Sequence, residues 1–295
     1  MSLFTGSCVA MVTPFNENGV NFEALDKSID FQINEGTDAL LACGTTGEPP
    51  TMTKQEKRDV IAFTIEKGKG KLPVYAGVGG NATAEVVRAS IEAEELGADA
   101  LLIVNPYYNK ANARGLLAHY QAVSDEVSIP IIIYNVPSRT NCNITAATLQ
   151  ELVKIKNIKA IKEASGDIAQ VLEMYRTCGD RIDIYSGNDD MVVPLMAAGG
   201  NGVISVVANV APRDTHNMVE AFLSGNIEES LQLQLKLLPL IKALFCEVNP
   251  IPVKTAMNLM GFNMGPLRLP LADMADNNLE LLKHAMQDYG LILTK

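Results

Sequence analysis

Short apolar runs alternate with longer amphipathic segments along most of the chain, up to about residue 207. Short runs of branched and aliphatic residues predict buried strands, whereas apolar residues at helical spacing predict helices. We expect eight strands, over residues 8–12, 39–43, 74–78, 100–104, 131–134, 158–162, 182–185 and 203–207. We expect the intervening helices to include residues 22–35, 54–66, 84–96, 113–127 and 146–153.

Local signals fix several helix ends. Thr53 and Glu56 have the spacing of a capping box, in which each side chain pairs with a free backbone N–H at a helix start. Gly36 and Gly97 each follow a helical pattern and precede an apolar run, as expected of residues that end a helix in a left-handed conformation.

Near-continuous apolar strands that alternate with helices predict parallel strands covered on both faces, and eight such units favour a (β/α)8 TIM barrel. A doubly wound open sheet is the alternative. Its nucleotide-binding glycine motif would follow the first strand, where the chain instead has Thr13-Pro14-Phe15-Asn16.

Beyond about residue 207 the pattern predicts helices alone, over residues 212–223, 227–246, 253–260 and 271–287. We therefore expect a catalytic barrel over residues 1–225. A C-terminal helical domain should follow it over residues 226–295.

Composition excludes several classes of protein. The formal net charge is −10 over 295 residues, and no basic run is present, which argues against a nucleic-acid partner. The five cysteines are scattered and odd in number, as is usual in a reducing compartment. With no signal peptide and no long apolar stretch, we expect a cytoplasmic protein without a membrane partner. The three histidines lie far apart, so we expect no zinc site.

Lys162 is the most informative single residue. The alternation of a strand directs Ile158, Ala160 and Lys162 to the same side, so an amine stands where a core side chain belongs. Burial favours the neutral form of an amine, which is a nucleophile that can form an imine with a ketone. The alternative is a lysine with a packed stem whose head reaches solvent at the strand end.

Polar and aromatic residues follow the predicted strands repeatedly. They occupy residues 44–48, 105–109, 134–139 and 187–190. Loops at the carboxyl ends of barrel strands converge on one mouth, which would bring these segments together with Lys162. Each also has a plainer interpretation, since 44–48 could be a simple turn, Tyr134 a core tyrosine and Arg139 a partner in a surface ion pair.

Three motifs resemble those of the dihydrodipicolinate synthase family within the pyruvate-dependent class I aldolase superfamily. They are Gly44-Thr45-Thr46-Gly47-Glu48, the segment from Tyr134 to Thr140, and Lys162-Glu163-Ala164. The first and last are shared across the superfamily, whereas the Tyr107-Tyr108 pair and Ser138-Arg139-Thr140 are typical of this family. The similarity extends from the first strand to near the carboxyl end.

The resemblance implies a role for each site residue. Lys162 would form the imine with pyruvate, and Tyr134, Thr45 and Tyr108 would form a hydroxyl relay. Thr46 would hold the pyruvate carboxylate, Arg139 the carboxylate of the second substrate, and the backbone near Gly187 and Ile204 would line the pocket.

The resemblance also implies a carbon–oxygen lyase that condenses pyruvate with L-aspartate 4-semialdehyde on the route to diaminopimelate and lysine. It implies no metal and no organic cofactor. In the family the second tyrosine of the pair reaches the neighbouring subunit's site, so Tyr108 implies a homotetramer built from tight dimers.

Two other functions remain open from the sequence. A sister aldolase would act on N-acetylneuraminate or 2-keto-3-deoxy sugar acids, although Arg139 and Tyr108 favour a substrate with a second carboxylate. A catalytically silent barrel could bind a keto acid as a sensor. The joint presence of Lys162, Tyr134, Thr45 and Tyr108 argues against it.

One departure concerns regulation. Feedback-inhibited relatives bind lysine between subunits, at positions that align with Pro49, Pro50, Lys54, Lys57, Asn81, Glu85 and Tyr107. Lys54 and Lys57 stand where sensitive members usually have histidines, and Pro49 replaces a small hydroxyl residue. Since two fixed positive charges would repel the ammonium groups of lysine, we expect weak or absent inhibition.

Overall fold

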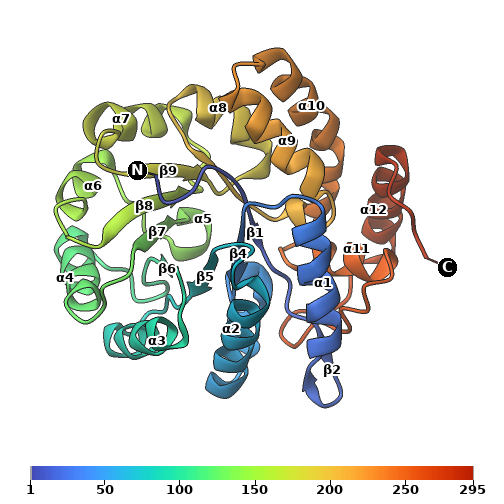
Figure 1. Ribbon diagram of the computed structural model, residues 1–295, viewed down its shortest axis with the longest axis horizontal. Helices are drawn as coiled ribbons and strands as arrows, with labels where there is room; N and C mark the ends of the chain where they lie inside the picture. Colours follow the sequence, from blue (N-terminus) through green and yellow to red (C-terminus); the bar gives the residue numbers. More distant parts are fainter. Residues whose placement is uncertain (1, 295) are drawn as a thin grey trace.

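Eight parallel strands close into a barrel at the centre of the computed structural model, which describes residues 2–294 (Figure 1). The strands are β1 (Gly6–Ala10), β4 (Ala39–Ala42), β5 (Val74–Gly77), β6 (Ala100–Val104), β7 (Ile131–Asn135), β8 (Ile158–Glu163), β9 (Asp183–Ser186) and β10 (Gly202–Ser205). Each strand pairs with the next along the chain, and β10 pairs with β1 to close the ring. The predicted TIM barrel is confirmed, and the open sheet is excluded.

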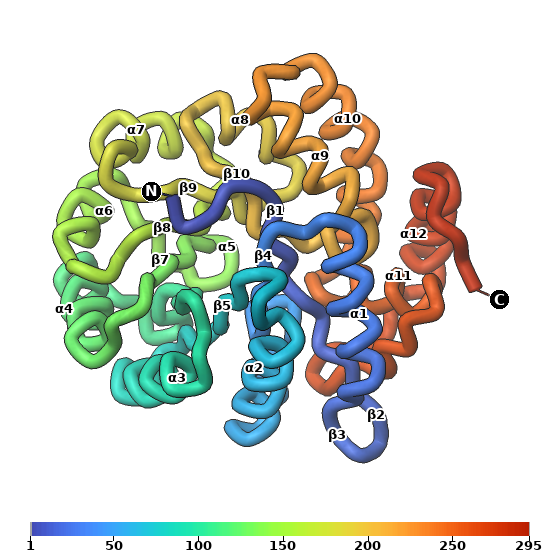
Figure 2. The backbone as a smooth tube through the Cα atoms, viewed as in Figure 1, coloured from blue at the N-terminus to red at the C-terminus, as the bar shows by residue number. Residues whose placement is uncertain are grey.

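The amino-terminal end of the barrel is closed by the first residues of the chain, which pass beside β9 and β10 (Figure 2). The Phe4 ring stacks on the Tyr185 ring with 4.1 Å between centroids. The Tyr185 hydroxyl donates a hydrogen bond of 2.6 Å to the Phe4 carbonyl. With this end filled by aromatic side chains, the opposite end is left for chemistry.

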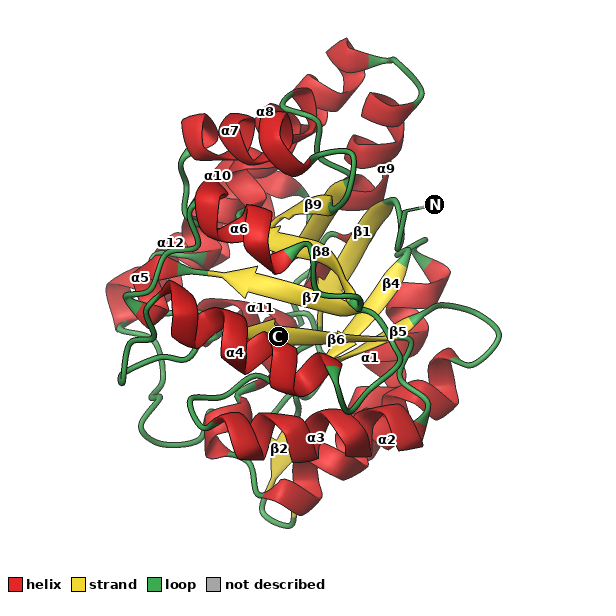
Figure 3. Ribbon diagram, turned by 90° about the vertical axis from the view of Figure 1, so that its left-hand side faces the viewer, coloured by secondary structure: helices red, strands yellow, loops and turns green. Residues whose placement is uncertain are grey.

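Helices surround the strands on the outside of the barrel (Figure 3). They are α1 (Phe22–Asn34), α2 (Lys54–Gly68), α3 (Thr83–Leu96), α4 (Ala113–Ser124), α6 (Ala146–Leu152), α7 (Ile168–Cys178), α8 (Val192–Ala197) and α9 (Pro212–Leu223). The Thr53–Glu56 capping box at the start of α2 is present as predicted. Gly97 ends α3 with a φ of +95°, which confirms the predicted left-handed cap.

Short elements occupy the loops after the strands, and they carry much of the candidate site. They are η1 (Thr45–Gly47), η2 (Pro49–Thr51), α5 (Pro137–Thr140), η3 (Asp189–Met191) and η4 (Val207–Asn209). A small hairpin of β2 (Phe15–Asn16) and β3 (Gly19–Val20) follows β1, and the sequence pattern did not predict it.

The chain ends with α10 (Ile227–Leu244), α11 (Ile251–Leu259) and α12 (Asp276–Tyr289). The last helix was expected from residue 271, which is wrong. It begins at Asp276, and residues 271–275 before it are not helical; the Ala275 N–H there donates to the Glu247 carboxylate at 3.0 Å. The domain boundary predicted at 225/226 falls in the turn between α9 and α10 and stays a prediction. Within residues 2–294, no helix has both the length and the apolar character needed to cross a bilayer.

Candidate active site

Lys162 and Tyr134 lie side by side at the carboxyl ends of β8 and β7. The two residues are direct partners in the strand register. Lys162 is only 5% exposed, and its Nζ lies 4.6 Å from the centroid of the Tyr134 ring. The amine is therefore held inside the barrel against a phenol, and the alternative of a lysine whose head reaches solvent is wrong.

Gly187, directly after β9, leaves room for the Lys162 side chain on the neighbouring strand. A Cβ at this position would lie 2.7 Å from the Ala164 Cβ and 3.0 Å from the Lys162 Cε, so a larger residue would displace the lysine stem. Ile204, on β10, is 1% exposed and belongs to the same apolar cluster inside the barrel as Tyr134 and Ala164. The structure thus places Gly187 against the lysine stem and Ile204 in the apolar interior of the barrel.

Two other ionisable groups lie near Lys162 within the barrel. Burial raises the pKa of the Cys8 thiol well above its usual range, and the positive charge of Lys162 only partly opposes this. Burial also raises the pKa of Asp189, whose Oδ2 accepts backbone N–H groups of Val206 at 3.0 Å and Val207 at 2.9 Å. Lys162 therefore has a buried thiol and a buried carboxyl group as ionisable neighbours.

A cavity of about 350 Å³ opens beside the Lys162–Tyr134 pair. Three predicted site residues line it, namely Thr45, Tyr134 and Arg139. Lys162 does not line the cavity itself, but its Nζ lies over the Tyr134 ring, which does. Thr46 is buried directly behind Thr45 in η1. The structure therefore brings Thr45, Tyr134 and Arg139 to one cavity, whereas Thr46, Gly187 and Ile204 are not in its wall.

Asn249 is a residue of this site that sequence reasoning missed. Its Nδ2 donates to the Thr46 Oγ1 at 3.1 Å, and its backbone carbonyl accepts from the Arg139 Nη2 at 3.0 Å. It thus connects the two residues predicted to bind carboxylates. The one available signal was the proline-flanked Asn249-Pro250-Ile251-Pro252 run, but Asn249 and Thr46 are 203 residues apart along the chain.

A buried ion pair fixes the other end of the η1 loop. The Lys254 Nζ, on α11, lies 2.7 Å from the Glu48 Oε1, and both side chains are almost completely buried. Burial lowers the pKa of Lys254, an effect that its hydrogen bond to Glu48 opposes. The C-terminal helices therefore hold the loop that carries Thr45 and Thr46.

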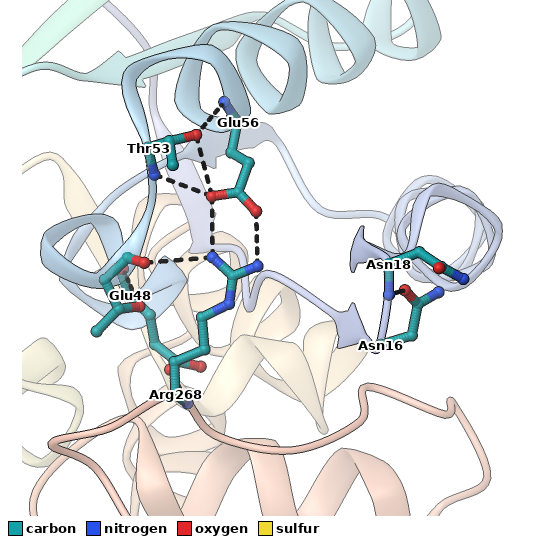
Figure 4. A network of polar contacts seen from close by, with 7 residues as sticks. Asn16, Asn18, Glu48, Thr53, Glu56 and Arg268 are labelled. Atoms are coloured by element: carbon teal, nitrogen blue, oxygen red, sulfur yellow. Dashed lines mark hydrogen bonds and ion pairs between the residues drawn. The ribbon is translucent and has the colours of Figure 1, made fainter.

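Arg268 extends this network to the start of α2, as Figure 4 shows. Its backbone N–H donates to the Glu48 Oε2 at 3.1 Å, and its guanidinium contacts both Glu56 oxygens at 2.6 and 2.9 Å. The hydrogen bond from Arg268 lowers the pKa of Glu56 to about 2. Since the folded-state pKa is lowered, the stability from this pair is present at neutral pH and is lost in strong acid.

Tyr108 is the one predicted catalytic residue that stands apart. It is 91% exposed, with a φ of +71°, in a turn beyond β6. The turn is held by the Asn109 Nδ2, which donates to the Asn81 carbonyl at 2.9 Å. Within one chain its side chain is therefore exposed to solvent and is not in the wall of the cavity beside Tyr134.

The comparisons with known proteins agree with this geometry. The model of the dihydrodipicolinate synthetase family matches residues 3–289. The chain is 57% identical, over 99% of both proteins, to 4-hydroxy-tetrahydrodipicolinate synthase from Thermoanaerobacter sp. (strain X514). The chain belongs to the dihydrodipicolinate synthetase family.

Solved structures of this family superimpose closely on the chain. Dihydrodipicolinate synthase from Aquifex aeolicus matches with a TM-score of 0.97 and 44% identity, over 99% of this chain and 100% of that one. The Acinetobacter baumannii enzyme, solved in complex with pyruvate, matches with a TM-score of 0.96 and 38% identity, over 98% and 100%. Membership in the dihydrodipicolinate synthetase family confirms the resemblance inferred from the motifs and the expected lyase class.

Proposed function

We propose that the protein is a 4-hydroxy-tetrahydrodipicolinate synthase, which condenses pyruvate with L-aspartate 4-semialdehyde in diaminopimelate and lysine biosynthesis. The observation that carries this proposal is the buried Lys162 amine, held 4.6 Å from the Tyr134 ring at the barrel mouth. Family membership over almost the whole chain supports the same reaction.

The proposed chemistry begins when the lone pair of the Lys162 Nζ attacks the C2 carbonyl of pyruvate. Loss of water gives an imine, and loss of a methyl proton then gives an enamine. The enamine carbon attacks the aldehyde of the second substrate to form the new C–C bond and an alkoxide that takes up a proton. The amino group of the second substrate then attacks the imine carbon, which closes the ring and releases the Lys162 amine. The imine nitrogen is itself the electron sink, so the reaction needs neither a metal nor an organic cofactor.

The remaining site residues serve this sequence of steps. Tyr134, Thr45 and Tyr108 would relay protons to and from the carbinolamine and the aldehyde oxygen. Thr46 would bind the pyruvate carboxylate, and the Arg139 guanidinium would bind the second carboxylate. The Gly187 and Ile204 backbone would line the pocket around the imine.

A coupled assay tests the proposed function directly. Pyruvate with L-aspartate 4-semialdehyde should turn over, whereas N-acetylmannosamine and sugar-derived aldehydes should not. Borohydride reduction in the presence of pyruvate should add a stable mass to the peptide that contains Lys162. Absence of a trapped adduct would favour a silent barrel instead.

We further propose that the protein is a cytoplasmic homotetramer built from tight dimers. The exposed Tyr108 side chain supports this assembly, because a phenol that is 91% exposed is free to reach the site of another chain. Cross-linking and sedimentation would reveal the assembly.

Tyr108→Phe should reduce turnover by about 10²-fold, the lower range for one lost proton-transfer group. Imine trapping with pyruvate should persist, because Lys162 and its surroundings are unchanged. Tyr175→Phe is the matched control, since Tyr175 is also partly exposed (46%) but lies on α7, far along the chain. Equal turnover in the two variants would contradict the relay.

L-lysine should inhibit the protein weakly, with an inhibition constant above about 1 mM, which corresponds to roughly −4 kcal/mol of binding. A second cavity, of about 680 Å³, is lined by Lys54, Lys57, Asn81, Glu85 and Tyr107 among others. The Lys54 Nζ lies 2.8 Å from the Glu85 Oε2, so a carboxylate that could bind an ammonium group is already paired. Steady-state assays with increasing L-lysine would measure this, and submillimolar inhibition would contradict it.

A further inference from the structure

A second pair of residues lies directly behind Lys162 and Tyr134. Asn135 follows Tyr134 and Glu163 follows Lys162, and the two are again direct partners in the register of β7 and β8. Because strand side chains alternate, this pair faces outward, into the layer between strands and helices. Asn135 is 0% exposed and Glu163 is 2% exposed.

Both polar atoms of the Asn135 side chain make two hydrogen bonds each. Its Nδ2 donates to the Glu163 Oε2 at 2.8 Å and to the Asn143 Oδ1 at 2.9 Å. Its Oδ1 accepts from the Ile144 backbone N–H at 2.9 Å and from the Asn105 Nδ2 at 3.4 Å. Asn105 is the residue directly after β6, so the contacts connect the carboxyl ends of three neighbouring strands.

Glu163 acts as acceptor in each of its hydrogen bonds. Its Oε2 accepts from Asn135, and its Oε1 accepts from the Ser165 backbone N–H at 2.7 Å and from the Gln170 Nε2 at 3.5 Å. This arrangement suits a carboxylate, which has acceptors alone. Burial raises the pKa of Glu163, and the three hydrogen bonds counteract that rise.

We propose that Glu163, together with Asn135, is a positioning residue for the reaction. The inference rests on the proposed function, since it concerns how Lys162 meets Tyr134. The Glu163 carboxylate joins β8 to β7 one residue beyond the Lys162–Tyr134 pair, and so fixes the relative height of the two strand ends. A misplacement of about 1 Å in a reacting group can cost on the order of 10²-fold in rate.

Glu163→Gln is the first test. The amide keeps the shape of the carboxylate, but its NH₂ group must face a donor from Asn135 or Ser165, so one hydrogen bond is lost. We expect turnover and the rate of imine trapping with pyruvate to fall by about 10–100-fold, as expected for a displaced reacting group. Circular dichroism should show a folded barrel.

The double variant Asn135→Asp/Glu163→Gln tests the mechanism. It reverses the hydrogen bond between the two positions, because the new amide at position 163 would donate to the new carboxylate at position 135, while Ser165 still donates to the amide oxygen. The hydrogen bond that Asn135 donates to the Asn143 Oδ1 is lost in this variant. We expect turnover to recover to within about tenfold of the unchanged protein, well above the value predicted by multiplying the effects of the two single variants. Asn135→Asp alone should be poorer, since two carboxylates would then face each other.

Asn157→Ala is the matched control for a purely structural role. Asn157 directly precedes β8 at its other end, is 5% exposed, and donates from Nδ2 to the Ser124 carbonyl at 3.3 Å. It should lower the melting temperature while turnover stays within about threefold, because it lies far from the reacting groups.

The proposal is overturned if Glu163→Gln is no slower than Asn157→Ala, or if the double variant shows no recovery. A failure of the proposed function would appear separately, as no imine in the unchanged protein.

Discussion

Lys162→Ala is expected to abolish imine trapping and to reduce turnover by about 10⁴-fold or more, since loss of a covalent nucleophile elsewhere costs on the order of 10⁶-fold. Lys57 also lines the cavity beside Tyr134, but Lys162 is the amine that lies over the Tyr134 ring. The nearby Cys8 thiol cannot substitute, because burial raises its pKa and holds it protonated. The coupled assay and mass spectrometry after borohydride reduction would measure both losses.

Lys159→Ala is the matched control, because Lys159 belongs to the same strand, β8, but its side chain is exposed. It should retain both trapping and turnover within about twofold, as is usual for surface substitutions. If Lys162→Ala still formed an adduct at the same rate, another nucleophile would have to be sought.

Lys254→Met should destabilise the protein by about 3–5 kcal/mol, the usual effect of leaving one buried charge without its partner. The charge left behind is Glu48, whose side chain is almost fully buried. Because Glu48 ends the η1 loop, turnover should fall as well as stability. Thermal and urea unfolding would measure the change, with pyruvate KM as the functional readout.

Two comparisons separate the buried pair from ordinary charge removal. Lys27→Met removes an ion pair with Glu23 in which both side chains are largely exposed, at 65% and 80%, and should change stability by at most about 1 kcal/mol. Lys254→Met/Glu48→Gln should be less destabilised than the sum of its single variants, since neither buried charge then stands alone. Strictly additive losses would count against the buried pair as the source of stability.

The barrel was predictable because its signals are local. Every predicted strand overlaps an observed one, since fully buried parallel strands appear as short apolar runs. The start of α2 was readable from Thr53 and Glu56 because both groups of a capping box lie within one turn. The start of the last helix was predicted too early, since Leu271 and Met274 are apolar residues at helical spacing although they lie before the helix.

The amino-acid sequence by itself determined the barrel and the family, and it singled out Lys162 as the predicted nucleophile, because periodicity and short motifs are properties of neighbouring residues. The tertiary structure alone decided that Asn249 contacts Thr46 and that Lys254 pairs with Glu48, across 203 and 206 residues of chain. It also decided that Asn135 and Glu163 form a bonded pair behind the site. Such contacts arise only when the barrel closes and the C-terminal helices pack against its mouth, and no local pattern encodes that proximity.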